Sequence, residues 1–184
     1  MVLETLGSIV SNNLSTIVDV CKDIRTNRIN KDGILIAYRF EVTSNLTLLN
    51  DIKIEKLQPE KIRNKSFIQL VNLLENSIGL SMVFSQDRTN LKKFKSSLKR
   101  EKIPINEEIE AEGSKMNSKQ YTLFDLILNS VSKINALKHI ISIVSQSEQC
   151  DFLPNYFISV RVRNIREYLE QINNFLPNPN LEEK

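Results

Sequence analysis

Hydrophobic positions between residues 123 and 144 recur at alternating intervals of three and four residues. Ile127, Ile134 and Ile141 lie seven residues apart and therefore fall on one stripe of an α-helix. The full stripe is Leu123, Ile127, Ser130, Ile134, Leu137, Ile141 and Val144. This pattern predicts one long helix that faces an apolar partner along its whole length.

The same period predicts helices in several other parts of the chain. Ser66 and Gln69 have the spacing of a capping box, in which each side chain bonds a backbone amide at the start of a helix. The predicted helices cover residues 3–28, 34–57, 66–82, 91–98 and 158–176. Residues 157–162 also alternate like a strand, so the sequence leaves helix and strand open there.

Residues 104–118 show no helical period and contain Pro104, Gly113 and four glutamates. We expect this segment to be the longest loop of the protein, and mobile. Pro177 and Pro179 end the last helix and leave a polar tail over residues 177–184.

Composition favours helices as well. Only four glycines and five prolines occur among 184 residues, whereas sheets and glycine-rich cofactor loops need more turn residues. A hydrophobic content of 41% and a charged content of 26% are ordinary for a globular protein. We therefore expect an all-α fold, an antiparallel bundle of five to six helices that forms a single domain over residues 1–184.

Several features favour a cytoplasmic location. Cys21 and Cys150 are far apart and have no metal-ligand spacing, which is typical of buried thiols in a reducing compartment. The N-terminal residues lack the basic leader of a secretion signal. No apolar run approaches the roughly 20 residues that a membrane span needs.

Groups that could carry catalysis are scarce. His139 is the only histidine, and the helical period places it opposite the apolar stripe, toward solvent. A helical nuclease family uses an arginine four to six residues before a histidine, but Lys133, Ile134 and Asn135 occupy those positions. Phosphate-binding glycine motifs and zinc motifs do not occur. We expect no catalytic residues, no bound metal and no cofactor.

Glu41 and Asn45 lie four residues apart on the inner side of the predicted helix 34–57. Our favoured interpretation is that they are buried polar residues and that Asn45 fixes the packing register. The alternative is an enzyme in which Glu41, Glu75 and Asp125 converge in a polar pocket.

A row of basic residues is the clearest signal for binding. Spacings of four and three place them along one helix face, where they could contact phosphate groups. The row consists of Arg88, Lys92, Lys95, Lys99 and Lys102. A solvated helix face, screened by the acidic residues that follow, is the alternative.

The run Glu41-Val-Thr-Ser-Asn45-Leu-Thr-Leu-Leu49 resembles a motif of uncharacterised bacterial helical-bundle proteins. A later helix of that group has a rhythm similar to Ile134-Asn135-Ala136-Leu137. The resemblance implies a bundle with buried glutamate and asparagine positions and transfers no activity.

Together, these patterns predict a non-catalytic helical-bundle protein that acts through protein–protein interaction or self-association. Ile140 and Ile143 lie off the main stripe and are candidates for a second apolar face. The alternative function is that of an accessory protein that binds nucleic acid through the basic row 88–102.

Overall fold

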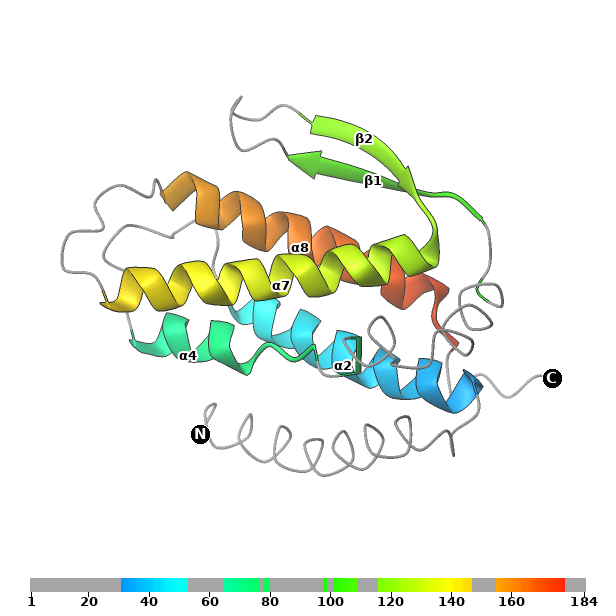
Figure 1. Cartoon of the computed structure of the whole chain (residues 1–184), viewed down its shortest axis with the longest axis horizontal. Coiled ribbons are helices and arrows are strands. Elements are labelled where there is room, and N and C mark those ends of the chain that lie inside the picture. Colours follow the sequence, from blue (N-terminus) through cyan, green and yellow to red (C-terminus); the bar gives the residue numbers. More distant parts are fainter. Residues whose placement is uncertain are drawn as a thin grey trace.

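A computed structural model describes residues 31–52, 65–76, 78–79, 98, 101–108, 116–146 and 155–177 of the chain. Four helices and two strands occupy these ranges: α2 (Lys31–Asp51), α4 (Lys65–Leu73), β1 (Ile103–Glu108), β2 (Met116–Tyr121), α7 (Leu123–Gln146) and α8 (Asn155–Phe175). Figure 1 shows α7 and α8 side by side, with the two strands along one side of this pair.

Helix α7 confirms the predicted long helix. Its seven stripe positions, from Leu123 to Val144, are all buried. The helix begins after a capping box in which the Asp125 amide donates to Thr122 Oγ1 and the Thr122 amide donates to Asp125 Oδ2, both at 3.2 Å. This local signal, together with the stripe, explains where the helix starts and what it packs against.

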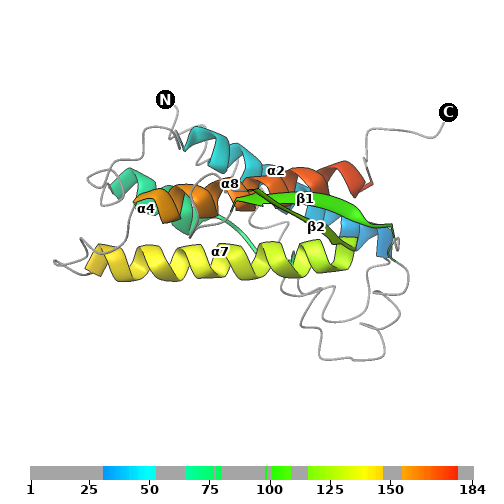
Figure 2. The same cartoon turned by 90° about the horizontal axis from the view of Figure 1, so that it is seen from above.

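Helices α8 and α2 supply much of the remaining core of the described residues. The residues predicted as the start of the last helix, 157–162, are helical and not a strand. Ile158, Val162, Ile165, Leu169 and Ile172 from α8 are buried, as are Leu35, Tyr38, Val42 and Leu49 from α2. The views in Figures 1 and 2 agree that α8 lies between the hairpin and α2. These apolar faces close into one cluster with α7.

The predicted all-α bundle of five to six helices is wrong. Residues 103–108 pair with 116–121 as an antiparallel hairpin, from Ile103 opposite Tyr121 to Glu108 opposite Met116. Strands therefore occupy both ends of the segment 104–118 that we expected to be a loop. Burial along β1 alternates with the period of two that defines a strand. Every second residue, Ile103, Ile105 and Glu107, faces the helices, and the charge of Glu107 hid this pattern in the sequence.

The third predicted helix is shorter than its hydrophobic period suggests. Helix α4 ends at Leu73, residues 74–76 are not helical, and helical geometry returns at Ile78 and Gly79. Side chains from α2 occupy this interruption. The expected helices over 3–28 and 91–98 and the tail 178–184 lie outside the described residues, except Leu98, which is buried. None of the described helices is long and apolar enough to cross a membrane.

Candidate functional site

Two side chains of α2 hold the interruption after α4. The Glu41 carboxylate accepts hydrogen bonds from the backbone amides of Ile78 (2.7 Å) and Gly79 (3.2 Å). Asn45 pairs with the backbone of Glu75, donating to its carbonyl at 2.6 Å and accepting from its amide at 2.7 Å. We call these contacts the Glu41 staple. They satisfy backbone groups that a continuous helix would have paired internally.

Burial raises the pKa of the Glu41 carboxyl group. Glu41 is 1% exposed, and the loss of water raises its pKa to about 7, although the two backbone amides act in the opposite direction. Burial also raises the pKa of Glu75 and lowers that of Lys138, which faces both carboxyl groups. One oxygen of Glu75, Oε2, is buried without a hydrogen-bond partner.

The Glu41 staple also requires a close approach at Gly79. A Cβ atom there would lie 2.7 Å from Val131 Cγ2 and 3.1 Å from the Tyr38 ring. Both neighbours are buried, and valine has little rotamer freedom with which to move aside. Glycine at this position lets the backbone reach the Glu41 carboxylate.

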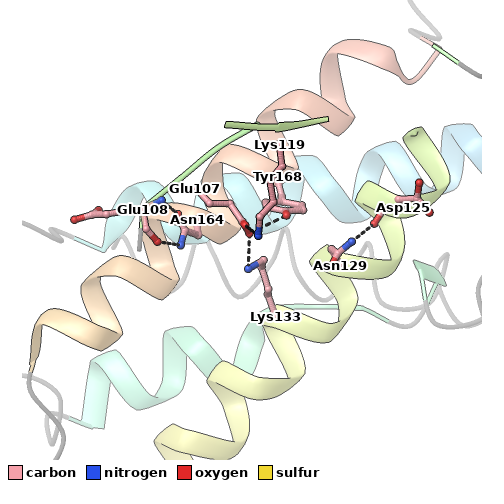
Figure 3. Close-up of polar contacts among 8 residues, drawn as sticks. All are labelled: Glu107, Glu108, Lys119, Asp125, Asn129, Lys133, Asn164 and Tyr168. Carbon is pink, nitrogen blue, oxygen red and sulfur yellow. Dashed lines mark hydrogen bonds and ion pairs between the residues drawn. The ribbon is translucent and has the colours of Figure 1, made fainter. Parts of the chain in front are cut away.

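A second buried carboxylate lies beneath the hairpin. Glu107 accepts hydrogen bonds from Lys119 of β2 (2.7 Å), Lys133 of α7 (2.8 Å) and the Tyr168 hydroxyl of α8 (2.8 Å). Figure 3 shows these side chains converging on Glu107 from three different elements. We call these four residues the Glu107 network. It links the hairpin to both central helices.

Two of the three partners of Glu107 are charged lysines, and together with Tyr168 they reverse the effect of burial on its pKa. Loss of water alone would raise its pKa, but the hydrogen bonds from Lys119, Lys133 and Tyr168 outweigh it and lower the pKa to about 2. The carboxylate in turn raises the pKa of Lys119. Burial and the bonds to Tyr121 and Glu107 raise that of Tyr168. Lys133 also lies 5.1 Å from the centre of the Tyr168 ring.

Helix α8 anchors the end of β1 through a second set of contacts. Arg163 pairs with the Glu108 carboxylate through two bonds of 2.6 and 3.0 Å. The Asn164 side chain accepts from the Glu108 amide at 2.9 Å and donates to its carbonyl at 3.0 Å. Figure 3 shows this pairing beside the Glu107 network. Asn164 therefore takes the place of a neighbouring strand at this point of β1.

The Asn164 contacts reveal which backbone groups of the hairpin face outward. Because both backbone groups of Glu108 point toward α8, Glu108 and Met116 form a non-hydrogen-bonded pair. Such pairs alternate along an antiparallel ladder. Pro104, which has no N–H, occupies one of them, opposite Gln120. The backbone groups of Met116, Ser118 and Gln120 consequently point away from β1.

We call these outward backbone groups of Met116, Ser118 and Gln120 the β2 edge. No other described residue forms a hydrogen bond with them. Residues 116–120 are all exposed, and Met116 is 60% exposed. In Figure 1, β1 lies between β2 and α8, so β2 is the outer strand. The described part of the chain thus ends its sheet in an open edge.

The structure brings together only two of the three carboxyl groups of the enzyme hypothesis. Glu41 and Glu75 interact electrostatically, whereas Asp125 caps α7 and pairs with Thr122. Figure 3 shows Asp125 beside Asn129, whose side chain donates to its carbonyl at 2.7 Å. No group of three or more histidine, cysteine, aspartate or glutamate residues within the described ranges could hold a metal ion. Among the described residues, the contacts of Asp125 are with Thr122 and Asn129, and none of them involves Glu41 or Glu75.

The other predicted site residues have different outcomes. Glu41 and Asn45 are each 1% exposed. Lys102 is exposed, whereas Arg88, Lys92, Lys95 and Lys99 lie outside the described residues. His139 is exposed, as its place opposite the stripe predicts. Ile143 is 47% exposed, but Ile140 packs partly against the core.

Sequence reasoning missed the Glu107 network and the β2 edge. The available signal was the alternation Ile103, Ile105, Glu107, in which the proline and asparagine between them take the other face. Treating Glu107 as part of an acidic loop concealed that alternation. The lysines of the network lie 12 and 26 residues further along the chain, so no local spacing identifies them as partners of Glu107.

Comparisons with known proteins identified no relative of this chain. No family model matches this chain, and no curated protein or solved structure shows significant similarity to it.

Proposed function

We propose that this protein is a non-catalytic binding protein that contacts other protein chains through the β2 edge. The observation that carries this proposal is a row of outward backbone donors and acceptors, at Met116, Ser118 and Gln120, that no described residue pairs. An exposed strand edge is a template for pairing with another extended chain.

Within the described residues, nothing covers this edge and no proline interrupts it. Proteins protect edge strands with prolines, with charges or with a covering element. The proline of this hairpin, Pro104, is on the opposite strand, and Lys119 directs its amino group to Glu107 at 2.7 Å. The other edge of the sheet is occupied at Glu108 by Asn164. The contrast between a covered β1 edge and an open β2 edge supports a role in binding.

The remaining buried polar groups support a structural role. Glu41 and Asn45 bind backbone, and Glu107 binds two lysines and a tyrosine. These hydrogen bonds hold the backbone after α4 and the strand β1 in place, which is the structural role that we propose for these carboxylates.

Purification of a tagged copy from the source organism, in which the untagged chain is also present, tests this proposal. Mass spectrometry identifies the bound chains, and an untagged second copy counts as one of them. Ser118→Pro removes the central outward N–H while leaving the bonds to β1 intact, whereas Ser118→Ala leaves the backbone unchanged. We expect the native chain and Ser118→Ala to retain the same bound chains and Ser118→Pro to lose them. Equal recovery by all three proteins would contradict the proposal.

A further inference from the structure

We infer that the chain bound at the β2 edge is a second copy of this protein, paired antiparallel to the first about a two-fold axis at Ser118. This inference rests on the proposed function, since it names the partner of the same edge. Its basis is that β2 is complementary to itself in this arrangement, in both backbone and side chains.

The backbone groups match in this register. Antiparallel pairing centred on Ser118 places Ser118 opposite Ser118 of the second copy and Met116 opposite Gln120 of the second copy. All of these residues have outward backbone groups, so each is opposite a residue that can exchange two hydrogen bonds with it. A shift by one residue would instead set outward groups against residues that already bond β1.

The side chains match as well. The same register places Asn117 opposite Lys119 of the second copy, so no like charges lie directly opposite each other. It also places the exposed Met116 beside the aliphatic part of Gln120. A shift centred on Lys119 would set two lysines directly opposite, which is unfavourable. A shift centred on Asn117 would pair only Met116, Asn117 and Ser118 with residues of β2 in the second copy. The Ser118 register is therefore the most favourable one for this strand.

The two-fold symmetry limits this arrangement to a dimer. A two-fold interface uses the same surface on both copies, so association stops at a dimer with a four-stranded sheet. Asn164 blocks the opposite edge of each hairpin at Glu108, which disfavours further strands there. The chain's net charge of +3 imposes little repulsion between two copies.

Cysteine cross-linking tests the register. Ser118→Cys should form a disulfide-linked dimer on mild oxidation, because directly opposite residues have Cα atoms about 5.5 Å apart, within the range that a disulfide spans. Asn106→Cys is the matched control: Asn106 is exposed and is the β1 neighbour of Ser118, but two copies of it would lie three strand spacings apart, about 14 Å. The native chain, which contains Cys21 and Cys150, gives the baseline.

Light scattering during gel filtration tests the association itself. We expect a dimer for the native chain and for Ser118→Ala, and at least tenfold weaker association for Ser118→Pro. A monomer in the native chain, or equal cross-linking of Ser118→Cys and Asn106→Cys, would overturn the second copy as the partner. If Ser118→Pro lost its helical circular dichroism, this variant would be unfolded and its association would not count. The comparison of Ser118→Cys with Asn106→Cys would then decide whether the partner is a second copy.

The two proposals fail in different ways. A monomeric native chain that still loses bound proteins from the source organism on Ser118→Pro substitution overturns the second copy and retains the β2 edge as a binding surface. A dimer that survives in folded Ser118→Pro overturns the second copy at this edge. Unchanged recovery of bound proteins by that variant contradicts the proposed function as well.

Discussion

Glu41 and Glu107 are both buried glutamates, yet the fold treats their charges in opposite ways. Glu41, 1% exposed, receives two hydrogen bonds from uncharged backbone amides, and its pKa rises to about 7. Glu107, 8% exposed, receives bonds from two lysines and a tyrosine, and its pKa falls to about 2. Burial penalises both carboxylates, so the charge of the donors decides the direction of the shift.

The Glu41 staple and the Glu107 network also have different structural roles. The Glu41 staple lies inside the helical layer and secures an interruption of the backbone. The Glu107 network lies between the helices and the hairpin, and therefore supports the strand that carries the β2 edge. Substitutions in the Glu41 staple should lower the stability of the whole fold. Substitutions in the Glu107 network should also weaken binding at the β2 edge.

The largest expected effect is that of Glu41→Ala. It would leave the amides of Ile78 and Gly79 buried without acceptors, which should lower the free energy of unfolding by roughly 4 kcal/mol. Glu41→Gln keeps one acceptor oxygen and should lose less. Urea unfolding measures both values. Equal loss in the two variants would show that the hydrogen bonds are not what Glu41 contributes.

The dependence of stability on pH should separate the two glutamates. The folded-state pKa of Glu41 is raised from 4.5 to about 7, so its contribution is present below pH 4.5 and is lost as pH rises through 7, by about 3 kcal/mol. Glu107 has the opposite sign: its contribution is present above pH 4.5 and is lost as pH falls toward 2. Unfolding curves recorded from pH 2 to 8 test this.

Glu41→Gln and Glu107→Gln serve as controls for this pH experiment. The first variant should lose the decline in stability between pH 4.5 and 7, and the second should lose the decline below 4.5. A native chain whose stability rises steadily from pH 4.5 to 7 would contradict the assignment of Glu41.

Glu107→Gln should have a smaller effect on stability, about 2 kcal/mol, because the lysines that pair with Glu107 are 46% and 31% exposed and can regain water. It should also weaken dimer formation, which Glu41→Gln should not do at equal stability. Light scattering and urea unfolding measure the two effects. Lys119→Met, which removes only the more exposed partner, is the matched variant and should cost under about 1 kcal/mol.

Gly79→Ala should have a smaller effect than the substitutions of Glu41 and Glu107, about 1–2 kcal/mol. The added methyl group would lie 2.7 Å from Val131 Cγ2 and would push the backbone away from Glu41. Thermal unfolding measures the loss. A neutral result would mean that Val131 moves aside and that the Glu41 staple tolerates a wider approach.

Much of the helical layer could be predicted from the sequence. The stripe of α7, the inner face of α2 and the period of α8 follow from spacings of three and four residues, which any helix must place on one side. Glu41 and Asn45 could also be recognised as inner-face residues. The break after Leu73 could not, because the groups that stabilise it lie 30 or more residues away on α2.

The hairpin and its edge were decided by tertiary structure. A period of two over six residues, interrupted by Pro104 and ending in glutamates, is a weak local signal. Only the convergence of Lys119, Lys133 and Tyr168 makes it favourable to bury Glu107. The sequence by itself determined α2, α7 and α8, since helical hydrogen bonds and faces are local. The charges of the two buried glutamates and the orientation of the β2 edge depend on contacts between distant residues, and only the tertiary structure specified them.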